Sequence, residues 1–190
     1  MVSTNNYNWK ILVGGAGSVG KTTFLFRYLT NQFIANTALT VGVQLHSHSI
    51  QRYGKKIGLI IWDLGGQERF HFLHETYMKG ASAALVMYDI SQIRTLFDAK
   101  DWIDLFRSYS GQALPILLVG SKLDIADDAT HEHSEMEASN MVRELELAGF
   151  IETSSKWGKN VEETMNHLVD LIAAQKIGTV DVAEANISDA

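Results

Sequence analysis

The sequence predicts an α/β domain, a three-layer sandwich in which helices cover both faces of a mostly parallel six-stranded sheet with one antiparallel edge strand. Short apolar runs rich in branched residues alternate with longer stretches of helical periodicity, an order typical of this class. The runs 83–90 and 116–120 are continuously apolar, as are strands buried on both faces of a parallel sheet. The 190 residues suit one domain over 1–176 and a frayed acidic tail over 177–190.

The amino-terminal half is predicted to contain three strands and one helix. The apolar run 9–13 forms the first strand, and after a glycine-rich loop residues 21–30 form a helix. The runs 43–51 and 57–63 flank residues 53–55, Tyr-Gly-Lys, which favour a turn. These two runs are therefore expected to form a hairpin.

Three amphipathic helices are expected in the carboxyl-terminal half. Each has one apolar face, formed by Leu96, Ala99, Ile103 and Phe106, by Ala138, Met141, Leu145 and Ala148, and by Val161, Met165, Leu168 and Ile172. Ser134 with Glu137, and Asn160 with Glu163, have the spacing of capping boxes at the starts of the last two helices. Gly149 is expected to end the second helix as a left-handed cap.

Composition narrows the classes of function. Sixteen Lys and Arg against 22 Asp and Glu give a net charge of −6, the wrong sign for a protein that binds the phosphates of nucleic acid. The chain has no cysteine, so disulfides, thiolate zinc sites and sulfur-linked lipid anchors are not expected. Residues 1–8 are polar with Val at position 2, which predicts neither a signal peptide nor myristoylation. We therefore expect a cytoplasmic protein without a direct lipid anchor.

A phosphate-binding loop is predicted between the first strand and the first helix. The pattern of Gly, four residues and Gly-Lys-Thr is formed by Gly15, Ala16, Gly17, Ser18, Val19, Gly20, Lys21 and Thr22. In such a loop backbone N–H groups converge on phosphate, and the helix N-terminus adds its dipole. Lys21 would neutralise the outer phosphates, and Thr22 would offer its hydroxyl to Mg²⁺. The loop alone does not choose between ATP and GTP.

The order of motifs resembles the Ras superfamily of small GTPases over about residues 9–175. Residues 62–70, Trp-Asp-Leu-Gly-Gly-Gln-Glu-Arg-Phe, and 77–81, Tyr-Met-Lys-Gly-Ala, look most like the Rab branch. Leu64-Gly65 instead looks like Arf proteins and heterotrimeric G-protein α subunits, because Rab and Ras chains have Thr-Ala there. The resemblance implies the fold of a P-loop small GTPase domain, GTP or GDP as ligand, and Mg²⁺ as cofactor.

The resemblance also implies a magnesium and γ-phosphate site. Thr22 and Thr40 are similar to its hydroxyl ligands, and Asp63 to the carboxylate that holds the ion, usually through water. Thr37 competes with Thr40, although the Thr-Val-Gly context belongs to Thr40. Gly66 would give its N–H to the γ-phosphate, where a side chain would block close approach.

Catalytic roles follow from the same resemblance. Gln67 matches the glutamine that orients the attacking water, and Lys21 would stabilise the transferring charge. In Ras itself an arginine from an activating protein adds about 10³ to 10⁵ in rate. The resemblance marks no such arginine here, and Arg69 and Arg94 are interpreted as surface charges. Slow turnover that awaits an activating protein is expected.

Guanine selection is predicted in residues 121–124, Ser-Lys-Leu-Asp, where the family commonly has Asn-Lys-x-Asp. Asp124 can accept hydrogen bonds from the guanine N1–H and 2-amino group, a donor pair that adenine lacks. The stem of Lys122 is expected along the base plane. Because Ser121 stands where the family has Asn, we expect the loss of a tie between loops and weaker nucleotide retention.

Further nucleotide contacts are implied by resemblance. Thr153 is followed by Ser154, Ser155 and Lys156, and this segment resembles Thr-Ser-Ala-Lys, whose backbone N–H meets the guanine oxygen. Phe33 falls where the family has an aromatic ring edge-on to guanine, although alone it could equally be a core residue. Thr23, after Thr22 at the helix start, belongs to the same implied nucleotide site.

The leading hypothesis is a molecular switch that hydrolyses GTP to GDP and phosphate. Switch I over 36–43 and switch II over 65–78 would order around the γ-phosphate and relax after hydrolysis, so that an exchange factor, an activating protein and effectors could read the state. One alternative is a nucleotide-holding scaffold with negligible turnover, suggested by Ser121 and by Gly65-Gly66. Another is an ATP-dependent P-loop enzyme, in which Asp124 and Lys156 would have no role.

Overall fold

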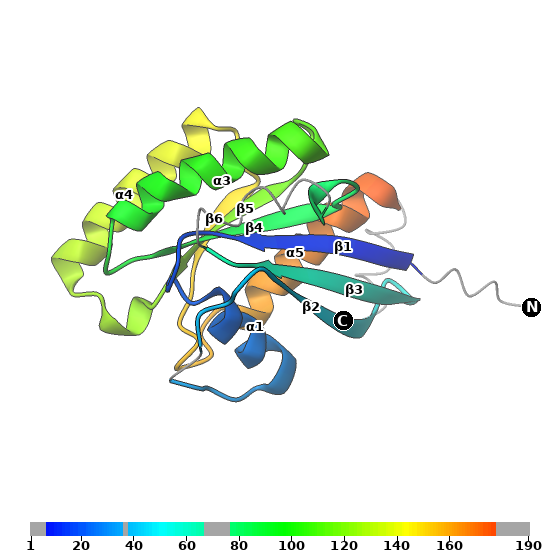
Figure 1. Cartoon of the computed structure of the whole chain (residues 1–190), viewed down its shortest axis with the longest axis horizontal. Helices are drawn as coiled ribbons and strands as arrows, with labels where there is room; N and C mark the ends of the chain where they lie inside the picture. Colours follow the sequence, from blue (N-terminus) through cyan, green and yellow to red (C-terminus); the bar gives the residue numbers. More distant parts are fainter. Residues whose placement is uncertain (1–6, 36–37, 67–76, 178–190) are drawn as a thin grey trace, which may run out of the picture.

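The computed structural model describes residues 7–35, 38–66 and 77–177, which form a three-layer α/β sandwich (Figure 1). The central sheet has six strands in the order β2-β3-β1-β4-β5-β6. The edge strand β2 is antiparallel to β3, and the other neighbouring pairs are parallel. The predicted fold class is confirmed.

The strands are β1 (Tyr7–Gly14), β2 (Val43–Arg52), β3 (Lys55–Leu64), β4 (Ala83–Asp89), β5 (Ile116–Ser121) and β6 (Gly149–Glu152). Five of them lie where apolar runs predict strands, whereas β6 is only four residues long and has no continuous apolar run. Because the parallel strands share one direction, the loops that follow β1, β3, β4, β5 and β6 meet at one edge of the sheet, where ligands bind in such folds.

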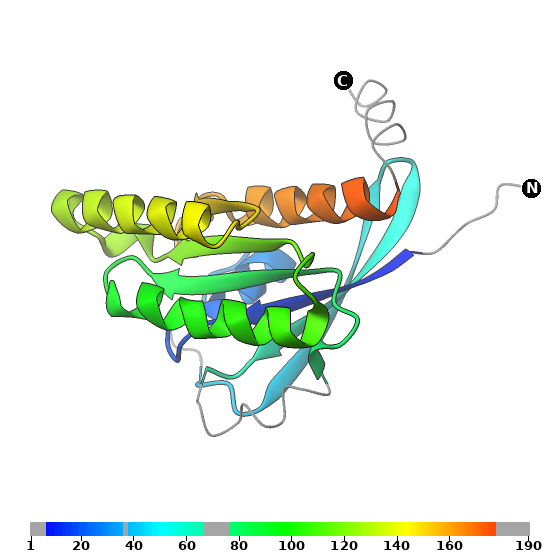
Figure 2. The same cartoon turned by 90° about the horizontal axis from the view of Figure 1, so that it is seen from above.

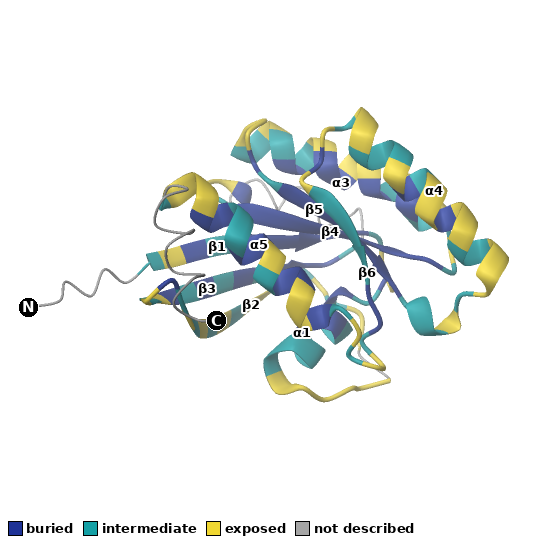
Figure 3. Ribbon diagram, turned by 180° about the vertical axis from the view of Figure 1, so that it is seen from behind, coloured by how far each residue is buried: buried dark blue, intermediate teal, exposed yellow. Residues whose placement is uncertain are grey.

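Helices cover both faces of the sheet. On one face lie α1 (Lys21–Thr30) and α5 (Val161–Lys176), as Figure 3 shows from behind. The odd-numbered residues within 9–13 of β1 and 57–61 of β3 belong to the buried cluster on this face. On the other face lie α3 (Arg94–Ser110) and α4 (Asp128–Glu144), and Figure 2 shows α3 and α5 on opposite sides of the strands. β4 and β5 are buried along their whole length because they lie between the two cores. No helix in the described part of the chain is long and apolar enough to cross a membrane.

The start of α4 differs from the prediction. The helix begins at Asp128, and the side chain of Asp127 caps it by accepting a hydrogen bond from the Thr130 N–H at 2.8 Å. Ser134 lies inside the helix instead, fully buried, with its Oγ 2.8 Å from the hydroxyl of Tyr88. A core partner therefore overrides the preference of serine for helix starts.

The end of α4 is also earlier than predicted. The helix ends at Glu144, and Glu146 takes the left-handed conformation with φ 48°. Gly149 is the first residue of β6, so it is not the predicted cap. The short connection leaves Ala148 exposed rather than on the inner helix face.

The start of α5 is at the predicted position, but the predicted capping box does not form. Asn160 is the N-cap residue in a left-handed conformation, and its side chain makes no bond to the helix. Its Nδ2 donates instead to the carbonyl oxygen of Glu152 at 2.7 Å. Asn160 therefore fastens the start of α5 to the end of β6.

A histidine links α4 to β6 and gives the fold a pH dependence. The Nε2 of His131 lies 2.6 Å from Oε2 of Glu152, and this hydrogen bond raises the pKa of His131 above its ordinary 6.5. Because folding favours the protonated ring, the stabilisation is complete below that ordinary value and is lost as pH rises through the raised pKa. His131→Gln is expected to lower the free energy of unfolding by less than about 1 kcal/mol at about pH 6, since partly exposed pairs contribute little. At about pH 9 a smaller effect is expected, because the stabilisation is lost as pH rises.

Urea unfolding of the protein at the two pH values measures this difference. His133→Gln is the matched control, because His133 is exposed on the same helix. An equal loss for His131→Gln at both pH values would contradict the titration argument.

Candidate functional site

The phosphate loop lies between β1 and α1 with its lysine folded back into it. The Nζ of Lys21 donates to the carbonyl oxygens of Gly15 and Ala16, each at 2.8 Å, and the residue is only 6% exposed. Burial lowers the pKa of Lys21 to about 8, and the charge of Asp63 opposes this shift. A buried ammonium held by neutral carbonyls is costly, so an anion such as phosphate would stabilise it.

Two hydroxyls and a carboxylate converge beside this lysine. Thr22 Oγ1 donates to Asp63 Oδ2 at 2.6 Å and lies 2.7 Å from Thr40 Oγ1. Asp63 is fully buried, and its Oδ1 has no hydrogen-bond partner among the described residues. Burial raises the pKa of Asp63, although the hydrogen bond from Thr22 and the charge of Lys21 lower it. Mg²⁺ prefers a few oxygen ligands, so this arrangement fits the predicted ion.

The two glycines after β3 are explained by close backbone packing. A Cβ on Gly66 would lie 2.4 Å from the backbone N of Gly17 and 2.6 Å from the oxygen of Ala16. A Cβ on Gly65 would lie 2.6 Å from the carbonyl oxygen of Thr40. Position 66 therefore has to be glycine for the chain to pack against the phosphate loop. Position 65 has to be glycine because the backbone of Thr40 packs closely against it.

Two adjoining cavities lie at this edge of the sheet. The first, of about 300 Å³, is lined by Gly17, Ser18, Gly20, Lys21, Thr22, Thr23, Ala35, Ala38, Leu39, Thr40, Gly66 and Lys122. The second, of about 270 Å³, is lined by Gly20, Thr23, Phe33, Ala35, Ser121, Lys122, Asp124, Ile125, Ser155 and Lys156. Phe33 is 40% exposed, so it lines the second cavity instead of belonging to the core. Because both cavities are lined by Gly20, Thr23, Ala35 and Lys122, the pair suits one elongated ligand.

The second cavity holds an acidic group in a fixed orientation. Asp124 Oδ1 accepts a hydrogen bond from Ser154 Oγ at 2.7 Å, and the same Oγ accepts the Trp157 N–H at 3.1 Å. Ser154 is fully buried, so it supports Asp124 from beneath rather than lining the cavity. The carboxylate of Asp124 is therefore held in place as a hydrogen-bond acceptor at the second cavity.

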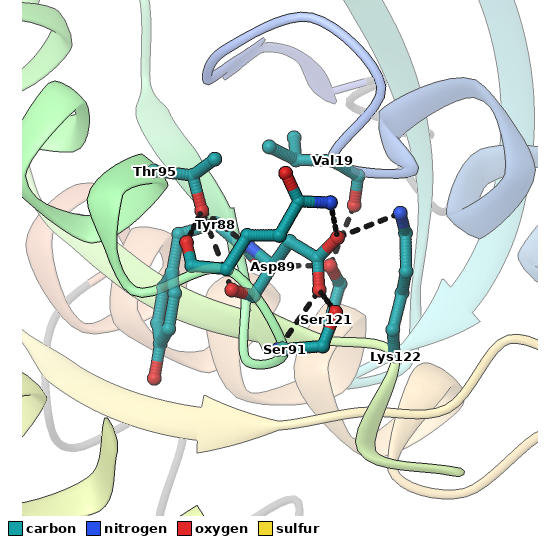
Figure 4. A network of polar contacts seen from close by, with 8 residues as sticks. Val19, Tyr88, Asp89, Ser91, Thr95, Ser121 and Lys122 are labelled. Atoms are coloured by element: carbon teal, nitrogen blue, oxygen red, sulfur yellow. Dashed lines mark hydrogen bonds and ion pairs between the residues drawn. The ribbon is translucent and has the colours of Figure 1, made fainter. Parts of the chain in front are cut away.

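Ser121 corrects one expectation. Its Oγ lies 2.5 Å from the carbonyl oxygen of Val19 in the phosphate loop and 2.7 Å from that of Tyr88, as Figure 4 shows. The single hydroxyl proton is shared between the two carbonyls. The tie between the phosphate loop and the end of β5, expected to be lost without asparagine, is therefore present. The short side chain reaches Val19 because Ser121 is the last residue of β5, buried beneath the loop.

Ser121→Ala is expected to release GDP about tenfold faster, because it leaves two buried carbonyls without their donor. Stopped-flow dissociation of a fluorescent GDP analogue measures this rate. Ser108→Ala is the control, since Ser108 Oγ donates to one backbone carbonyl, that of Leu105, on the exposed side of α3. An unchanged rate for Ser121→Ala would contradict the assigned tie.

The sequence prediction missed Asp89, which holds Lys122. Lys122 Nζ lies 2.7 Å from Asp89 Oδ2, and Asp89 is 1% exposed at the end of β4 (Figure 4). The Asp89 carboxylate also accepts hydrogen bonds from Gln92 Nε2 and from the backbone and hydroxyl of Ser91. A lone charged residue within the apolar run 83–90 is a signal that could have found it, because buried charges are paired.

Some predicted residues are not placed. Gln67 and Thr37 lie outside the described residues, as do the tail residues 178–190. The predicted separation of the tail and the catalytic role of Gln67 therefore remain predictions.

A strand, a glycine-rich loop and a helix with a buried lysine define an α/β protein of the P-loop type. The family model for the Ras family matches residues 10–174. The chain belongs to the Ras family and is close to its Rab members, which are GTP-hydrolysing switch proteins.

Rab-3 proteins are among the relatives that this chain resembles. Ras-related protein Rab-3A of Homo sapiens is 35% identical over 187 residues, which cover 97% of this chain and 83% of the relative. GTP-binding protein Rab-3D of Rattus norvegicus is 36% identical over 167 residues, covering 88% of this chain and 75% of the relative. Ras-related protein Rab-3C of Bos taurus is 35% identical over 167 residues, with 88% and 72% covered.

Proposed function

We propose that this chain is a guanine-nucleotide switch that binds GTP, hydrolyses it slowly to GDP and phosphate, and signals the difference through switch I and switch II. The observation that carries the proposal is the pair of adjoining cavities, with Lys21 in the first and the oriented carboxylate of Asp124 in the second. The cavity with Lys21 would suit a polyphosphate, and the cavity with Asp124 would suit a base that carries two adjacent hydrogen-bond donors.

Each site residue would have a separate role in nucleotide binding or hydrolysis. Lys21 would bind the outer phosphates and stabilise the charge that develops on them, while Asp124 would select guanine. Thr22, Thr40 and Asp63 would hold Mg²⁺, which supplies neutralisation of phosphate charge when bound. Gln67 would orient the attacking water, as the resemblance implies.

The switch output is supported by the contacts around the phosphate loop. Thr40 reaches Thr22, and Gly66 packs on Gly17 and Ala16. Thr40 of switch I and Gly66 of switch II therefore lie beside the phosphate loop, where a γ-phosphate would order them and its loss would release them. An exchange factor, an activating protein and effectors are the partners expected to read this difference.

Gln67→Leu tests the hydrolytic role. The variant is expected to slow single-turnover GTP hydrolysis by about tenfold or more, because the water loses its orienting group, while GDP affinity stays within about twofold. Chromatography of bound nucleotide over time gives the rate, and Gln112→Leu, at an exposed position, is the control. Equal rates in Gln67→Leu and the unmodified protein would refute the role. Persistent GTP in the unmodified protein would favour a scaffold that only holds nucleotide.

A further inference from the structure

An arginine of α1 reaches the loop that follows β6. Arg27 Nε donates to the carbonyl oxygen of Ser155 at 2.6 Å, and its Nη2 donates to that of Lys156 at 2.7 Å. Its Nη1 donates to the carbonyl oxygen of Asn31 at 2.8 Å, at the end of α1. Across the described residues, no carboxylate pairs with this guanidinium. The guanidinium of Arg27 therefore donates its hydrogen bonds to backbone carbonyl oxygens.

The hydrogen bonds from Arg27 fix the orientation of the peptide groups that contain the Ser155 and Lys156 carbonyls. Ser155 and Lys156 line the second cavity, whereas Arg27 lines a separate cavity of about 510 Å³ between α1, β2 and α5. In a trans peptide the C=O and the following N–H point in opposite directions. Because Arg27 draws the carbonyl of Ser155 away from the second cavity, the Lys156 N–H of the same peptide group is left to face it.

The second of these peptide groups also connects to Asp124. The Trp157 N–H, in the same peptide group as the Lys156 carbonyl, donates to Ser154 Oγ, which donates to Asp124 Oδ1. Hydrogen bonds in such a chain polarise one another, and a bond from a guanidinium is stronger than a neutral one. Arg27 thus supports both the donors of the loop and its acidic acceptor.

We propose that Arg27 is a positioning residue for guanine recognition: it holds the Ser155–Lys156 peptide group so that its N–H, and not its carbonyl oxygen, faces the O6 atom of the base. The inference rests on the proposed function, because it requires guanine in the second cavity. Without Arg27 the Ser155–Lys156 peptide could turn, and a carbonyl oxygen would then repel O6.

The test compares GDP with 6-thio-GDP, in which sulfur, a weak acceptor, replaces O6 while the N1–H and 2-amino group remain. Arg27→Met is expected to weaken GDP binding by about tenfold, which is the contribution of one neutral hydrogen bond from the loop N–H to O6. Because 6-thio-GDP makes little use of the loop donors, its affinity is expected to fall by less than about threefold. Inosine diphosphate retains O6 and is expected to weaken in parallel with GDP. Competition against a fluorescent GDP analogue measures all three affinities.

Arg52→Met is the matched control. Arg52 lines the same 510 Å³ cavity, donates to Asn166 Oδ1 and Asp170 Oδ2, and makes no hydrogen bond to the loop. Its GDP affinity is expected to stay within about twofold. Arg27→Lys keeps the charge without the fork that bonds two carbonyls, so an intermediate loss is expected, and this variant carries the test if Arg27→Met does not fold.

The two proposals fail in different ways. If Arg27→Met or Arg27→Lys weakens GDP and 6-thio-GDP by the same factor, or leaves both unchanged, Arg27 does not position the O6 donors, although the protein still binds guanine nucleotide. If the unmodified protein binds ADP as tightly as GDP, the proposed function itself is wrong and the inference falls with it.

Discussion

Replacing Asp124 with asparagine is expected to weaken GDP binding by about 10²- to 10⁴-fold, because hydrogen bonds to a carboxylate contribute about 1.5 to 3 kcal/mol each and two are lost or weakened. The amide would present a donor to the 2-amino group of guanine, where an acceptor is needed. Xanthine carries an oxygen at that position, so xanthosine diphosphate is expected to bind the variant more tightly than GDP does. The support from Ser154 at 2.7 Å keeps the side chain in place to make this exchange.

Isothermal titration with GDP, xanthosine diphosphate and ADP measures the reversal. Asp127→Asn is the control, because Asp127 lies three positions away, caps α4 through the Thr130 N–H, and asparagine caps a helix as well as aspartate does. An Asp124→Asn protein that keeps its preference for GDP would mean that the second cavity does not read the base through this carboxylate.

Lys21→Met is expected to lower the affinity for GDP by about 30- to 5,000-fold, because it removes a buried cation that would lie against the phosphate oxygens, a loss of about 2 to 5 kcal/mol. The folded protein is expected to lose little stability without nucleotide. Burial lowers the pKa of Lys21 to about 8 from 10.5, so the folded state holds this proton less tightly than the unfolded state, and the charge opposes folding below that range. The loss of the bonds to Gly15 and Ala16 offsets part of this gain.

Thermal unfolding with and without GDP separates the two effects. The melting temperature without nucleotide is expected to change little, while the rise that GDP produces in the unmodified protein is expected to disappear. Lys100→Met, at an exposed position on α3, serves as the control. If GDP stabilises Lys21→Met as much as the unmodified protein, the lysine does not bind phosphate.

The fold could be predicted because its strongest signals are local. The continuous apolar runs became β4 and β5, and every inner-face residue predicted for α3 and α5 is buried. The predictions failed where tertiary contacts compete with local preference. Ser134 bonds to Tyr88 across the core instead of capping a helix, and Gly149 begins β6 instead of ending α4.

The candidate site could be predicted from motifs, but its supports could not. Lys21, Asp63 and Asp124 belong to motifs of fixed spacing, so they can be identified as candidate site residues from the sequence alone. Asp89 contacts Lys122, 33 positions away, and Arg27 contacts two carbonyls that are 128 and 129 positions away. No sequence motif has a fixed spacing that would predict such pairs. The contact of Ser121 with Val19 was missed for the same reason, because it depends on how closely β5 approaches the phosphate loop.

Loading the purified protein with equimolar GTP and ATP in the presence of Mg²⁺, and identifying the bound nucleotide by chromatography over time, tests the central claim most directly. The account predicts that GTP is bound first, that GDP replaces it slowly, and that ATP is not retained. Bound ATP, or a pocket that retains neither nucleotide, would contradict the assignment of the two cavities to a guanine nucleotide.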